Sequence, residues 1–140
     1  MNKFRQIALI LPAVFVAVIL IGAPLAHAGA LEDMMASYEA AGAGPFDVTR
    51  GKAMWTKTHN DSETGQQRAC ASCHTDNLAL AGKHKKTGKV IDPMAPSANP
   101  ERLTEVKKIK KWFKRNCDWT LGRECTPQEQ GDFLTYIKGL

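Results

Sequence analysis

The pentapeptide Cys70-Ala71-Ser72-Cys73-His74 constrains this chain more than any other stretch. Two cysteines at this spacing lie about one helical turn apart, so their thiols can form thioether bonds with the two vinyl groups on one edge of a porphyrin. The next residue, His74, is then placed to give an imidazole nitrogen to the iron as the proximal ligand. The motif therefore predicts one covalently attached haem c, held by Cys70, Cys73 and His74.

The CxxC part of the motif has two other known uses. A thioredoxin-like dithiol is expected in a βαβ setting, which the sequence does not show. Half of a zinc site is expected to have two further well-spaced ligands elsewhere in the chain, and none is visible. A disulfide or metal-handling module without haem is therefore the weaker hypothesis, and a covalent haem stain on a denaturing gel would exclude it.

Residues 1–28 have the three parts of a secretory signal peptide. Lys3 and Arg5 give the positive start, an apolar run follows over residues 7–21, and Ala26-His27-Ala28 provides a small-residue cleavage site. An uncleaved membrane anchor is the alternative. The run holds a proline and is soon followed by a glycine and another proline, so it is short and broken for a membrane span. We expect cleavage after Ala28 and a periplasmic protein without a membrane span.

The remaining residues, 29–140, suffice for one domain with a single core that a haem partly fills. The signal peptide holds two of the 19 lysines and arginines. Against 14 aspartates and glutamates, the rest of the chain keeps a small positive net charge, which does not suggest a nucleic-acid partner. Export to an oxidising compartment permits disulfides. With two cysteines assigned to haem, Cys117 and Cys125 are expected to pair, although four cysteines allow three connectivities. A second metal site is the less favoured use of this pair.

Helical periodicity and capping residues predict a mainly helical chain without notable strands. Gly51 and Trp55 lie four residues apart, and a glycine facing an aromatic side chain suits a close helix crossing. Residues 77–99 show little periodicity and are expected to form a long loop that wraps part of the haem. The expected helices are Gly29–Glu39, Val48–Thr58 with Asp47 as N-cap, Leu103–Arg115, and a last helix that starts at Pro127 after the cap Thr126.

The residues alone leave the ligand on the other side of the iron open. Met94 is the nearby methionine, and methionine is the usual sixth ligand of electron-transfer cytochromes. His84 and His59 are also possible ligands. For each of the three, a surface or packing role is the favoured interpretation, because none has supporting local context.

Four segments carry a resemblance to a known family. They are Cys70–Asp76, Pro93–Pro100, Lys111–Cys117 and Gly122–Pro127. Together they resemble the family of the oxygen-binding sphaeroides haem protein, and the match covers nearly all of residues 29–140. The helix order also resembles the all-α class I cytochrome c fold, in which the N- and C-terminal helices cross at a glycine and an aromatic residue.

The resemblance implies a set of site residues and partners. In this family an asparagine ligates the ferric iron, and the matching residue is Asn116; the family disulfide matches Cys117 and Cys125. Oxygen, nitric oxide and carbon monoxide are the implied ligands, and a dihaem cytochrome c is the implied electron donor. A basic face along the helix from Lys107 to Arg115 would suit docking of that donor, although a solvated charged face is its ordinary interpretation.

The amide side chain of Asn116 has an affinity for iron that depends on the oxidation state of the metal. An amide oxygen is a hard, neutral and weak donor, so it should bind ferric iron better than ferrous iron. Reduction would then open the position to a diatomic ligand. The competing interpretation is a helix C-cap, because asparagine is common at helix ends. A simple electron carrier with His74 and Met94 as ligands is the alternative function. An open ferrous site permits ligand binding, nitric oxide oxidation and peroxide chemistry alike, and the sequence identifies no catalytic acid or base.

Overall fold

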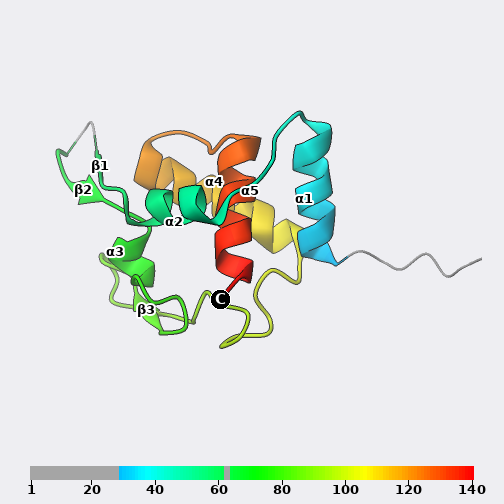
Figure 1. Cartoon of the computed structure of the whole chain (residues 1–140). Coiled ribbons are helices and arrows are strands. Elements are labelled where there is room, and N and C mark those ends of the chain that lie inside the picture. The colour runs from blue at the N-terminus through cyan, green and yellow to red at the C-terminus, as the bar shows by residue number, and fades with distance from the viewer. Residues whose placement is uncertain (1–28, 62–63) are drawn as a thin grey trace, which may run out of the picture.

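The computed structural model describes residues 29–61 and 64–140. The expected signal peptide, residues 1–28, lies outside the described residues, so its cleavage stays a prediction. Five helices and two short antiparallel hairpins form the described part (Figure 1). Within it, no helix combines the length and apolar character needed to cross a membrane. The predicted all-α fold is confirmed, since each strand holds only two residues.

The elements follow one another in a simple order. The helices are α1 (Ala30–Ala40), α2 (Val48–Thr56), α3 (Ala71–His74), α4 (Val106–Leu121) and α5 (Pro127–Lys138). The strands are β1 (His59–Asn60), β2 (Gln67–Arg68), β3 (Gly82–Lys83) and β4 (Val90–Ile91). β1 pairs with β2, and β3 pairs with β4 so that Lys83 lies opposite Val90. Outside β3 and β4, residues 77–99 have neither helix nor strand, as expected.

Helix α1 matches its predicted bounds to within one residue at each end. Its apolar side buries Met34 and Tyr38. These two side chains form a cluster with Ile109 of α4 and Leu134 of α5. The periodicity of the apolar residues therefore identified the buried side of this helix.

Helices α2 and α5 cross near the centre of the molecule (Figure 1), and Gly51 lies where they approach closely. A Cβ atom on Gly51 would collide with the main-chain carbonyl of Asp132 and with the Cβ of Tyr136. One turn later the Trp55 ring packs edge-on against Phe133 and Tyr136, with ring centroids 6.3 and 6.1 Å away. The predicted crossing of a glycine and an aromatic residue is confirmed.

A buried carboxylate fixes the start of α2 against α5. Asp132 of α5 is 2% exposed and accepts hydrogen bonds from the Arg50 side chain, the Asp47 main-chain N–H and Gln128. Asp47 in turn caps α2, because its carboxylate accepts from the main-chain N–H of Arg50 at 2.7 Å. The charge of Asp132 is thus fully paired although it lies inside the protein.

Helix α4 differs from its prediction at both ends. Leu103 has a left-handed backbone with φ of 63°, which a right-handed helix cannot include, so the helix begins at Val106. It continues through Asn116 and Cys117 to Leu121 and ends at Gly122, whose φ of 69° supplies the left-handed cap. The prediction of a helix over Leu103–Arg115 was wrong in its bounds, and the interpretation of Asn116 as a C-cap is wrong.

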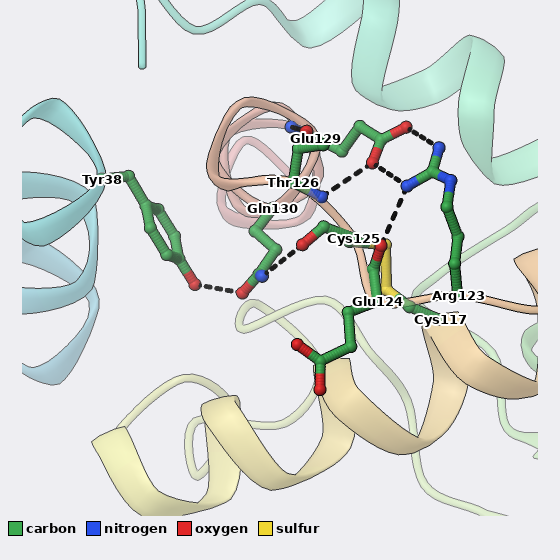
Figure 2. Close-up of a disulfide and its surroundings, with 8 residues drawn as sticks. All are labelled: Tyr38, Cys117, Arg123, Glu124, Cys125, Thr126, Glu129 and Gln130. Carbon is green, nitrogen blue, oxygen red and sulfur yellow. Dashed lines mark hydrogen bonds and ion pairs between the residues drawn. A yellow bond between two sulfur atoms is a disulfide. The ribbon is translucent and has the colours of Figure 1, made fainter. Parts of the chain in front are cut away.

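The predicted disulfide joins the last turn of α4 to the segment before α5 (Figure 2). Cys117 and Cys125 are bonded, with Cα atoms 5.6 Å apart. Thr126 and Glu129 form the capping box at the start of α5. Figure 2 also shows Gln130, which donates to the Cys125 carbonyl and accepts from the Tyr38 hydroxyl of α1.

Candidate haem-binding site

Helix α3 is a single turn that carries most of the CxxCH motif. The main-chain N–H groups of Cys73 and His74 both donate to the carbonyl of Cys70, at 3.3 and 3.1 Å. This turn gives the two cysteines the helical spacing that thioether attachment requires. Both cysteines are half-buried free thiols, not bonded to each other. They are therefore available for a covalent cofactor.

The Cys70 side chain ties α3 to α4. Burial raises the pKa of the Cys70 thiol to about 11, and the neighbouring Thr120 side chain acts in the opposite direction. Thr120 is buried in the last turns of α4. The C-terminal half of α4 therefore lies against the first cysteine of the motif.

The His74 ring is held in its neutral form. Burial first, and the positive charge of Arg102 second, lower its pKa to about 4. Its Nδ1 atom is buried without a hydrogen-bond partner among the residues that the structure describes. Buried polar atoms are nearly always partnered, and a neutral imidazole is the form that binds iron. His74 thus has the state and the unused bonding capacity of a metal ligand.

Two other residues hold the motif in place. The Trp55 indole N–H donates to the Thr75 carbonyl at 2.9 Å, and the Trp55 ring lies 5.5 Å from the His74 ring. Gly82 of β3 is buried directly against the motif, since a Cβ there would collide with the Cys73 carbonyl and crowd the His74 Cα. The α2–α5 crossing and the β3–β4 hairpin therefore both fix the position of α3.

Asn116 lies inside α4 and is half-buried. It shares a helix face with Thr120, four residues later, which contacts Cys70. Within residues 29–61 and 64–140, its side-chain amide makes no hydrogen bond to protein. The structure thus places a free amide on the side of α4 that meets the motif.

The other candidate ligands have different surroundings. Met94 is half-buried against the core cluster that includes Trp55 and Leu78, and its main-chain N–H donates to the Leu78 carbonyl at 2.8 Å. His84 is exposed in the β3–β4 hairpin, where its Nδ1 accepts from the Thr87 N–H at 3.2 Å. His59 is half-buried in β1, and burial lowers its pKa. Of these three, Met94 alone packs into the core that borders the motif.

Sequence reasoning missed several residues around the motif. Thr120 and Gly82 have no distinguishing local pattern, because their contacts with Cys70 and Cys73 arise only in the folded chain. Arg68 is a third case. Its guanidinium bonds the Trp119 carbonyl at 2.9 Å, pairs with Asp61 and stacks 4.8 Å from the Trp119 ring. These contacts attach the β1–β2 hairpin to the end of α4.

Comparison with known proteins identifies the family. Residues 41–137 match a family model described as a domain of unknown function, DUF1924. The chain is also 38% identical to cytochrome c-type protein SHP of Cereibacter sphaeroides over 119 residues, which cover 85% of this chain and 91% of SHP. The chain belongs to the SHP family of c-type cytochromes. Cytochrome c'' of Methylophilus methylotrophus is 39% identical over 90 residues, 64% of this chain and 62% of that protein.

Solved structures of SHP and of cytochrome c'' agree with the fold. Oxidised SHP, an oxygen-binding cytochrome c, aligns with a TM-score of 0.70 and 38% identity over 79% of this chain and 96% of SHP. Oxidised cytochrome c'' aligns with a TM-score of 0.68 and 35% identity over 77% of this chain and 92% of that protein. The cytochrome c-like fold is thereby confirmed.

Membership of the SHP family implies a covalently bound c-type haem. The residues present fit that group. Cys70 and Cys73 are unbridged thiols one turn apart, and His74 has a buried nitrogen with no partner among the described residues. The family assignment also decides against the dithiol and zinc hypotheses for the CxxC motif.

Proposed function

We propose that this chain is a periplasmic monohaem cytochrome that binds oxygen and other diatomic ligands when it is reduced. Cys70 and Cys73 attach the haem, and His74 is the proximal ligand. Asn116 would be the second protein ligand of the ferric iron and would release it on reduction. The observation that carries this proposal is the amide of Asn116, which has no hydrogen bond to the described residues and lies on the helix face that meets Cys70.

The bound haem would supply a redox-active iron with one coordination position for a small ligand. The chain supplies the control of that position. The amide oxygen of Asn116 is a hard and weak donor, so it favours the ferric state. Because α4 is anchored by the disulfide at Cys117 and by the contact of Thr120 with Cys70, the side chain of Asn116 can move while its main chain stays in place. Its N–H groups can then donate to a diatomic ligand.

Two relatives support this assignment. SHP is described as an oxygen-binding cytochrome c, and the solution structure of cytochrome c'' addresses the structural basis of haem-ligand detachment. Oxygen binding in SHP and haem-ligand detachment in cytochrome c'' therefore both support the proposal. We extend it here to nitric oxide and carbon monoxide, which bind ferrous iron in the same way as oxygen.

The proposed electron donor is a dihaem cytochrome c. A ligand-binding cytochrome of this kind must be reduced before its binding position opens, so a donor is part of the proposal. The donor is expected to carry negative charge, because many lysines of this chain are exposed, among them Lys83, Lys85, Lys107 and Lys110.

The test is spectroscopic. Ferric and ferrous spectra of the haem-loaded protein should be recorded with and without carbon monoxide. We expect the ferrous protein to bind carbon monoxide readily and the ferric protein to lack the near-infrared charge-transfer band of methionine ligation. Ferrous protein that does not bind carbon monoxide would refute the proposal.

The alternative is a simple electron carrier with His74 and Met94 as ligands. The packing of Met94 against the core beside Leu78 is the observation that favours it. A near-infrared methionine band in the ferric protein would establish that carrier instead.

A further inference from the structure

We propose that electrons enter this protein through the β3–β4 hairpin, residues 80–91, and that this hairpin docks an acidic electron-carrier protein. This inference rests on the proposed function, because it concerns the reduction that opens the iron. It assigns the docking surface to the hairpin in place of the basic face of α4. The partner loses one electron and the haem iron would gain it, and the bond that would change is the one from the Asn116 amide oxygen, which the proposed function releases on reduction.

The hairpin lies directly beside the haem-attachment motif. Gly82 lies so close to α3 that a Cβ atom would collide with the Cys73 carbonyl. A surface hollow is lined by residues of both segments, Ser72, Cys73 and Thr75 at the motif and Lys83 and Lys85 in the hairpin. The hairpin therefore directly adjoins the proposed haem attachment segment, which gives an incoming electron a short path.

The hairpin also carries a concentration of positive charge. Lys83, Lys85, Lys86 and Lys89 are all exposed, and residues 79–91 include no acidic residue. None of the four lysines forms an ion pair with any residue in the described ranges. Their charges are therefore available to attract an acidic surface and to raise its rate of association.

On the basic face of α4, in contrast to the hairpin, several charged side chains already have partners within the protein. Lys108 pairs with Glu105, and Lys114 pairs with Glu124. Lys111 and Arg115 lie against the Trp112 ring, at 5.6 and 5.2 Å from its centroid. Part of the positive charge of α4 is thus engaged within the molecule.

An apolar surface lies beside the lysines of the hairpin. Leu80 is 57% exposed and Val90 is 72% exposed, and Val90 lies opposite Lys83 in the hairpin. Small electron-transfer interfaces combine a modest apolar centre with charged surroundings, so that partners associate quickly and separate quickly. The hairpin offers this combination next to the motif.

The experiment uses the haem-loaded protein and two variants of equal charge. Lys85→Glu/Lys86→Glu changes the hairpin, and Lys107→Glu/Lys110→Glu changes α4; all four lysines are exposed and form no ion pair with the described residues. The first probe is hexacyanochromate(III), a paramagnetic trianion, which broadens the amide NMR signals near the site where it binds. The second is the rate of oxidation of the ferrous protein by hexacyanoferrate(III) at low salt.

We expect the chromium complex to broaden signals of residues 80–91 in the unchanged protein and in the α4 variant. The hairpin variant should lose this broadening and react with hexacyanoferrate(III) about 10-fold more slowly than the α4 variant. The difference should shrink at high ionic strength. Broadening centred on α4, equal rates for the two variants, or no localised broadening would each overturn the inference.

Carbon monoxide binding separates this inference from the proposed function. Both variants should bind carbon monoxide like the unchanged ferrous protein, because neither pair of lysines belongs to the proposed iron site. If the unchanged protein fails to bind carbon monoxide while the hairpin variant still reacts slowly, the ligand-binding function is refuted and the docking surface stands.

Discussion

The indole ring of Trp55 lies 5.5 Å from the imidazole ring of His74, and its N–H donates to the carbonyl of the next residue, Thr75. The same indole packs edge-on against Phe133 and Tyr136 of α5. One side chain therefore connects the crossing of α2 and α5 with the proposed iron ligand. The core that stabilises the fold also positions the site.

Replacing Trp55 with phenylalanine should disturb both the stability of the fold and the orientation of the His74 ring. The variant Trp55→Phe loses the indole N–H that Thr75 accepts, which should lower the free energy of unfolding by about 1 kcal/mol. The rotation of the His74 ring should also change, visible as altered g-values in the electron paramagnetic resonance spectrum of the ferric protein. Trp112→Phe is the control, since Trp112 is exposed on α4 and should change neither quantity. Identical results for the two variants would contradict the connection.

The close approach of α2 and α5 predicts a steric effect at Gly51. In Gly51→Ala the new methyl group meets the Asp132 main chain and the Tyr136 Cβ, so the helices must separate. We expect a loss of about 2 kcal/mol in urea unfolding of the haem-loaded protein. Lys52→Ala, at the exposed neighbouring position in the same helix, should be almost neutral. Equal stability of the two variants would show that the crossing is looser than the structure indicates.

The buried carboxylate of Asp132 predicts a dependence of stability on pH. Burial pushes its pKa upward, but hydrogen bonds from Arg50, Asp47 and Gln128 outweigh burial, and the net pKa lies below its usual value of 3.8. A carboxyl group whose pKa is lowered on folding stabilises the protein above its unfolded pKa, and this contribution is lost as the pH falls through the folded value.

Asp132→Asn should therefore destabilise the protein by about 2 kcal/mol at pH 7. The difference from the unchanged protein should shrink below about pH 4, where the carboxylate becomes protonated. Urea unfolding at several pH values measures this, with Asp118→Asn on the exposed side of α4 as the control. A difference that stays constant down to pH 2 would show that the charge of Asp132 is not the stabilising feature.

The proposed ligand predicts opposite outcomes for two substitutions. Asn116→Met places a soft sulfur on the α4 face that meets the motif, which should favour a stable low-spin haem and slow carbon monoxide binding at least 10-fold. Met94→Leu should leave the spectra and carbon monoxide binding unchanged. Absorption spectra and flow kinetics of both variants measure this. Unchanged spectra in Asn116→Met, together with an altered ferric spectrum in Met94→Leu, would move the ligand assignment to Met94.

Local chemistry explains what could be predicted. Cys70, Cys73 and His74 announce the haem because a spacing of a few residues fixes their relation within one turn of helix. The apolar period of α1 and the caps Asp47 and Thr126 are equally local, so those helix ends were predicted well. The two ends of α4 were not predicted correctly. The positive φ of Leu103 at its start and the continuation past Cys117 depend on packing and on the disulfide.

The sequence by itself determined the cofactor-binding motif, the helical class of the fold and the role of Gly51 and Trp55 of α2 in a close helix crossing. Only the tertiary structure decided which surfaces surround the motif. The contacts of Thr120 with Cys70, of Gly82 with Cys73 and of Trp55 with His74 join segments far apart in the chain. No local pattern encodes such contacts, because they arise only when the burial of apolar side chains fixes where each helix and hairpin lies.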